Sequence, residues 1–163
     1  MVACKPTVTE LTDEQKAALT DTVSAVHEEM MQRWLATDFD SVMPYFLNSP
    51  EVGWAWSGGV RHGYADLGAL FRPIFDSFES AEFAVGDQRV DVLAREAACV
   101  REYGAYTTTY TKGMTRKRDP FVMTTIWVRR NGESKILHID EASAESVLLR
   151  QLCQPKRRLR QNA

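Results

Sequence analysis

The chain has 163 residues, of which 44% are hydrophobic and 26% are charged, and its formal net charge is −2. This length and composition are typical of one globular domain with a substantial core, and they exclude disordered, fibrous and membrane-spanning classes. The near-neutral charge argues against general affinity for nucleic acid, and no run of about 18 apolar residues is present that could span a bilayer.

Three helices are predicted in the first half of the chain. Thr12 and Gln15 have the spacing of a capping box, which opens a long amphipathic helix. Asp38 is typical of the N-cap of a second, short helix that the sequence "NSP" closes. A third helix is expected over about 64–78, and Pro73 inside it predicts a kink or a break. The apolar stripe of the first helix consists of Leu19, Val23, Val26, Met30 and Trp34.

The stretch "EVGWAWSGGVRHG" predicts a hairpin with strands at 52–57 and 60–63, turned at the pair Gly58-Gly59. From Ala81 onward apolar residues alternate with a period of two, which predicts strands. Gly113 and the pair Asn131-Gly132 stand where hairpins of an antiparallel meander should turn. Helices combined with such a meander give an α+β domain in which the helices cover one face of the sheet.

The sequence predicts a flexible N-terminus at 1–11, a single domain at 12–143, and a short helix with a basic tail at 144–163. The three cysteines, Cys4, Cys99 and Cys153, lack metal-ligand or CxxC spacing. This indicates free thiols and favours a cytoplasmic location. The opening "MVACKP" allows an alternative, in which Cys4 is the modified residue of an exported lipoprotein whose upstream segment has been removed.

Several segments together resemble the nuclear transport factor 2-like superfamily, in its SnoaL-like branch. They are "TDFDSVMPYF", "VRHG" before the third helix, and "IWVRRNG" followed by "ILHID", within roughly residues 15–143. The resemblance implies a cone-shaped α+β fold, in which a strongly curved antiparallel sheet wraps the long first helix and leaves an apolar cavity at its open end. The superfamily includes isomerases, dehydratases, cyclases and hydrolases, as well as noncatalytic scaffold domains, so this fold does not fix the function.

Trp54 and Trp56 lie on the same face of their predicted strand, because side chains alternate along a strand. Two interpretations are open: the pair fills the core or a dimer contact, or it lines the cavity and grips a flat ligand. Tyr106 and Trp127 are the further candidates for ligand binding. The expected ligand is a small apolar or aromatic molecule.

Three residues are the candidates for acid–base catalysis. His138 and Asp140 share one face of the last strand, and a histidine held by a carboxylate suits a general base near neutral pH. Glu102 shares a face with Tyr106 on a central strand. If that face lines the cavity, Glu102 is a desolvated acid or base, and if it faces outward, Glu102 is half of a surface ion pair. The sequence leaves the register open.

Motifs for cofactors and nucleic acid are missing from the sequence. There is no GxGxxG, phosphate loop or GxSxG elbow, so no cofactor is expected, and His138 with Asp140 lacks a third ligand, so no metal is expected. The basic runs at 112–119 and 155–160 are typical of solvated segments.

Taken together, the resemblance, the aromatic pair and the acid–base candidates lead us to expect a homodimeric binding protein for a small molecule, with acid–base catalysis as its further function. The alternative is a noncatalytic homodimeric scaffold.

Overall fold

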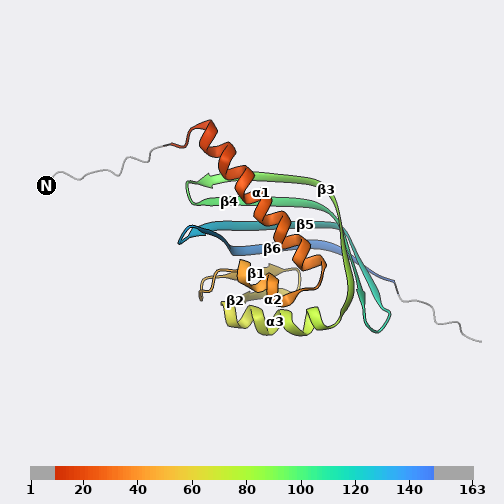
Figure 1. The fold of residues 1–163 in the computed structure, drawn as a ribbon. Helices are drawn as coiled ribbons and strands as arrows, with labels where there is room; N and C mark the ends of the chain where they lie inside the picture. Colours follow the sequence, from red (N-terminus) through yellow and green to blue (C-terminus); the bar gives the residue numbers. More distant parts are fainter. Residues whose placement is uncertain (1–9, 149–163) are drawn as a thin grey trace, which may run out of the picture.

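The computed structural model describes residues 10–148, with side chains up to Ala144. It consists of one six-stranded sheet with helices against one face (Figure 1). The helical elements are α1 (Asp13–Leu35), α2 (Phe39–Val42), the 3-10 helix η1 (Met43–Tyr45) and α3 (Tyr64–Asp76). The strands are β1 (Gly53–Trp56), β2 (Gly59–His62), β3 (Phe78–Ala94), β4 (Ala97–Tyr110), β5 (Thr115–Arg130) and β6 (Glu133–Leu148).

The helix boundaries follow from local capping chemistry. The Thr12 side chain accepts a hydrogen bond from the backbone of Gln15, and the Gln15 side chain accepts one from the backbone of Thr12, so the predicted capping box is confirmed. Asp38 caps α2 in the same manner through the backbone of Ser41. α3 continues through Pro73 to Asp76, so the alternative of a break at this proline is wrong.

The sheet has the strand order β2-β1-β6-β5-β4-β3, and β3 to β6 form the predicted antiparallel meander. β1 is the exception, since it pairs in parallel with β6 and makes the sheet mixed. The last meander turn has positive φ at both Asn131 (53°) and Gly132 (86°), as a type I′ hairpin requires. The α+β cone fold is therefore confirmed, with a parallel junction that the sequence did not predict.

Two boundaries differ from the expected ones. Trp56 pairs with Gly59, so the first hairpin turns at Ser57 and Gly58, one residue earlier than predicted. β6 extends to Leu148 because its pairing with β5 continues that far, so the helix expected from residue 144 is wrong over 144–148. The remainder of that segment, the basic tail and residues 1–9 lie outside the described residues.

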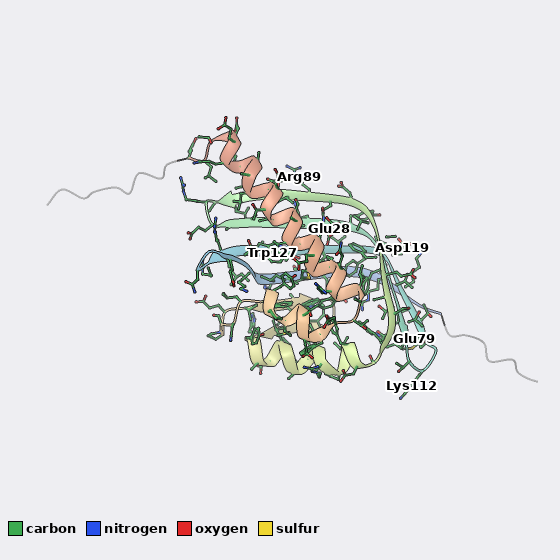
Figure 2. All side chains as sticks on the ribbon, viewed as in Figure 1. Glu28, Glu79, Arg89, Lys112, Asp119 and Trp127 are labelled. Carbon is green, nitrogen blue, oxygen red and sulfur yellow. The ribbon has the colours of Figure 1, made fainter. Side chains whose placement is uncertain are left out.

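The core lies between α1 and the sheet. α1 crosses the sheet obliquely, while α3 lies beyond β1 and β2, and β3, β4 and β5 bend past the C-terminal end of α1 (Figure 1). We call the face that carries α1 the inner face and the opposite face the outer face. Charged side chains such as Glu28 and Arg89 are exposed, whereas Trp127 lies fully buried beneath α1 (Figure 2). The bend in the long strands leaves room for a cavity on the inner face.

Candidate functional site

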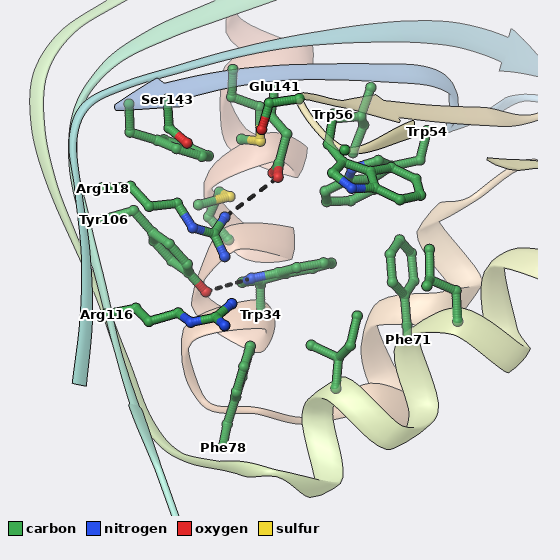
Figure 3. Close-up of a pocket in the computed structure, with 18 of the residues that line it drawn as sticks. Trp34, Trp54, Trp56, Phe71, Phe78, Tyr106, Arg116, Arg118, Glu141 and Ser143 are labelled. Carbon is green, nitrogen blue, oxygen red and sulfur yellow. Dashed lines mark hydrogen bonds and ion pairs between the residues drawn. The ribbon is translucent and has the colours of Figure 1, made fainter. Parts of the chain in front are cut away.

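An open cavity of about 530 Å³ lies on the inner face, where the bent strands leave the end of α1. Its walls come from α1, the β1–β2 hairpin, α3 and the meander strands, so segments from the whole domain meet here (Figure 3). A volume of this size suits a small organic molecule, since ligand pockets typically measure about 300–1,000 Å³.

One side of the cavity is aromatic. Trp34 of α1 stacks on Trp54 of β1, with ring centroids 5.3 Å apart and an interplanar angle of 19°. Phe71 of α3 contacts Trp54 edge-on at 4.7 Å, and Trp56 is half-buried at the cavity wall. Rigid aromatic faces of this kind bind flat apolar rings with little loss of conformational entropy.

The other side of the cavity is polar. Arg118 of β5 donates a hydrogen bond to Glu141 of β6 over 3.4 Å, and their side chains are 19% and 16% exposed (Figure 3). The Arg118 guanidinium also lies 5.2 Å from the ring centroid of Tyr106. The Tyr106 hydroxyl accepts a hydrogen bond of 3.0 Å from Nε1 of Trp34. Arg116 and Ser143 complete this polar wall.

Burial changes the acidity of two groups in this wall. The pKa of Glu141 is raised above its ordinary value, chiefly because burial disfavours the charged carboxylate; Arg118 opposes this shift and Asp140 adds to it. The pKa of Tyr106 is raised for the same main reason, against the hydrogen bond from Trp34. Glu141 is therefore a carboxyl group that exchanges protons at a higher pH than a solvated glutamate, which is the property of a general acid or base.

The predicted ligand-binding residues fall into two groups. Trp54, Trp56 and Tyr106 line the cavity. Trp127 lies away from the cavity, fully buried, and its Nε1 donates a hydrogen bond of 3.3 Å to Nδ1 of His27. Their role in binding a ligand stays a prediction, and the geometry places three of the four where a ligand can reach them.

His138 and Asp140 lie on the outer face, because Ile139 and Glu141 between and after them point into the cavity. The predicted alternation was right, since Glu141 indeed points opposite to the other two. The cavity does not contain His138 or Asp140, so these residues do not share a site with the aromatic residues that line it. The carboxylate of this strand that points into the cavity is Glu141.

Glu102 lies on the inner face but away from the cavity. It is 3% exposed, its Oε2 lies 3.0 Å from Nε2 of the fully buried His27, and its Oε1 accepts a hydrogen bond from Gln88. Neither alternative for Glu102 therefore applies: it does not face outward, and it does not line the cavity. The outer face carries Arg101 paired with Asp91 instead. With Trp127 on the other side of His27, this network joins α1 to the sheet.

Arg118, Glu141 and Trp34 are cavity residues that sequence reasoning missed. Trp34 belongs to the predicted apolar stripe of α1, which gave no sign that its end borders a cavity. Arg118 lies in a basic run that is typical of a solvated segment. The one available signal was the parity of β6, which places Glu141 on the face of Ile139.

Thiols and clusters of metal ligands are sparse among the residues that the structure describes. Cys99 has a free, buried thiol, and burial raises its pKa. Within residues 10–148 no three side chains of His, Cys, Asp or Glu gather closely enough to hold a metal ion. No helix in this part of the chain is long and apolar enough to cross a membrane.

Comparison with protein families gives one decisive match. The family model of the SnoaL-like domain matches residues 23–144, which is most of the chain and contains the whole cavity wall. The chain belongs to the SnoaL-like domain family. This confirms the resemblance to the nuclear transport factor 2-like superfamily. No curated protein matches this SnoaL-like domain.

Solved structures share the fold of this SnoaL-like domain. A hexachlorocyclohexane dehydrochlorinase from Novosphingobium barchaimii has a TM-score of 0.69 and 11% identity, over 88% of this chain and 99% of that chain. A nuclear transport factor 2-like protein from Salmonella enterica has a TM-score of 0.63 and 19% identity, over 76% and 92%. A protein from Novosphingobium aromaticivorans, provisionally named a scytalone dehydratase, has a TM-score of 0.65 and 14% identity, over 80% and 90%. At these identities the likeness shows the fold alone.

Proposed function

We propose that the protein binds a flat, mainly apolar molecule bearing a carbonyl or hydroxyl oxygen in the cavity, and exchanges a proton with it through Glu141. The observation that carries this proposal is the half-aromatic, half-polar wall of an open cavity of about 530 Å³. A filled or sealed interior would instead favour the scaffold alternative, since such a module needs no ligand.

The proposed division of roles follows from the two sides of the cavity. The ring system of the ligand packs against Trp54 and Trp56. Its oxygen accepts hydrogen bonds from Arg118 and from the Tyr106 hydroxyl, which is itself held by Trp34. This arrangement directs an acidic C–H or O–H of the ligand toward the polar wall that contains Glu141.

The proposed chemistry is a proton transfer. The Glu141 carboxylate takes a proton from the ligand, and the negative charge that develops on the ligand oxygen is stabilised by Arg118 and Tyr106. Return of the proton to another ligand atom gives an isomerisation, and departure of a leaving group gives an elimination. The names of the dehydrochlorinase and the dehydratase describe eliminations, which supports the same chemistry for this cavity.

Binding is tested with 2-tetralone, a flat ring ketone, by isothermal titration calorimetry. Trp56→Ala should weaken binding by about 1–3 kcal/mol, because the ligand loses an aromatic contact. Trp56 is chosen because it is half-buried, so its removal damages the core less than removal of the 6%-exposed Trp54. The control is Leu93→Ala, an exposed residue of β3 that does not line the cavity, which should bind like the parent. Equal binding by all three proteins, or no binding to any of them, would leave the scaffold alternative as the better explanation.

Proton exchange is tested with the same ketone in D₂O, by following deuterium incorporation next to the carbonyl by NMR. Glu141→Gln should lower the protein-catalysed rate about a hundredfold or more, at nearly unchanged affinity. The matched control is Asp140→Asn, the adjacent carboxylate on the outer face, which should lose far less of the rate because Asp140 acts on Glu141 through its charge alone. If Glu141→Gln retains the parent rate, Glu141 is not the base.

A further inference from the structure

Two of the three histidines of the chain meet on the outer face, far from each other in sequence. Gly53 of β1 pairs with His62 of β2 on one side and with His138 of β6 on the other. The three residues therefore form one row across the sheet, with a residue that lacks a side chain in the middle. The two imidazoles face each other across this gap.

The geometry of this row is tight. A β-carbon built on Gly53 would lie 2.9 Å from Nδ1 of His138 and 3.1 Å from Nδ1 of His62. The two nitrogens thus approach the same point, and they cannot be farther apart than the sum of these distances. Two nitrogens that bind one zinc ion at about 2.1 Å each lie at most about 4.2 Å apart. Metal binding requires the two nitrogens to reach this distance, and the exposed His62 side chain is not held in place by the core.

We propose that His62 and His138 form a binding site for a divalent transition-metal ion such as Ni²⁺, Cu²⁺ or Zn²⁺. Neutral imidazole nitrogens are ligands that these ions prefer. His62 is exposed and His138 is half-buried, so solvent reaches the pair. The Asp140 carboxylate, on the same face of β6, adds negative charge beside a bound cation. Because no third ligand of the described residues is close enough, water completes the coordination.

The proposed site is independent of the cavity. His138 and Ile139 are successive residues of β6, and Ile139 points to the cavity while His138 points to the outer face. His27, the remaining histidine, is fully buried and cannot compete for the ion. The juxtaposition of His62 and His138 could not be predicted from the sequence, because it depends on the parallel pairing of β1 with β6.

The test is a calorimetric titration of the full chain with Ni²⁺, after its thiols have been blocked with iodoacetamide so that cysteines cannot bind the ion. We expect one saturable site, and at least a tenfold loss of affinity in His62→Ala and in His138→Ala. Val60→Ala, an exposed residue on the same face of β2, should bind like the parent. Absence of saturable binding, or equal binding by His62→Ala, would overturn the proposal.

Two further measurements keep the proposal testable if a histidine variant unfolds. Gly53→Ala retains both ligands but inserts a methyl group between them, so it should also weaken Ni²⁺ binding at least tenfold. In the unmodified parent, Ni²⁺ should protect both His62 and His138 from diethylpyrocarbonate, as read by peptide mass spectrometry. Reaction of either histidine at an unchanged rate in saturating Ni²⁺ would contradict a shared site.

Discussion

At the scale of single residues, the raised pKa of Glu141 predicts an unusual pH dependence of stability. Burial favours the protonated carboxyl in the folded state. The stabilising contribution of this group is therefore fully present below the pKa of the unfolded chain, and it is lost as the pH rises through the raised pKa. The melting temperature of Glu141→Gln, relative to that of the parent, should therefore rise as the pH rises above about 4.3, the ordinary pKa of glutamate.

Glu133 provides a control of opposite sign. The hydrogen bond and charge of Lys135 hold the pKa of Glu133 below its ordinary value, so this group stabilises the fold above its unfolded pKa and loses that contribution as the pH falls. The melting temperature of Glu133→Gln, relative to that of the parent, should thus fall as the pH rises toward the ordinary pKa of glutamate. Circular dichroism melts measure both differences, below about pH 4.3 for Glu133 and above it for Glu141. Parallel curves for Glu141→Gln and the parent would show that burial does not raise the pKa of Glu141.

At the scale of elements, the close approach of β4 to β3 depends on Gly104. A β-carbon at this position would overlap the carbonyl oxygen of Ala84 and lie 2.9 Å from the Phe83 ring. Gly104→Ala should therefore lower the free energy of unfolding by about 3 kcal/mol or more, since backbone has to shift. The control is Gly68→Ala within α3, where the nearest atom is 3.7 Å away and alanine favours the helix. Urea denaturation compares the two, and similar losses would contradict the steric explanation.

The elements themselves were largely predictable because their signals are local. The caps at Thr12 and Asp38 and the turn at Asn131-Gly132 depend on residues close in sequence. The site was less predictable, because it depends on which strand face is the inner one. Alternation separated Glu141 from His138 and Asp140, but only the pairing of distant strands decides which of these faces the cavity.

At the scale of the whole molecule, we expect a homodimer formed through the outer face. Tyr103 of β4 and Val122 of β5 are neighbours in register on this face, and they are 53% and 39% exposed. An apolar patch of this kind on a sheet is typical of an interface. Sedimentation at tens of micromolar protein, about where a weak dimer still forms, should show a dimer. Val122→Glu should shift it toward the monomer, whereas a monomeric parent would argue against this interface.

The position of β6 between β1 and β5 has a consequence for the order of folding during synthesis. The ribosome completes β1 and β2 long before β6. Gly53 of β1 therefore cannot pair with His138 of β6 until that strand has been synthesised. At about 5–20 residues per second this delay lasts several seconds. During that time the edge of β1 that later pairs with β6 has no partner strand, and the aromatic face of Trp54 lacks Ile139 beside it. The nascent chain is therefore most exposed to aggregation just before β6 emerges, and this is the interval in which a chaperone has most to protect.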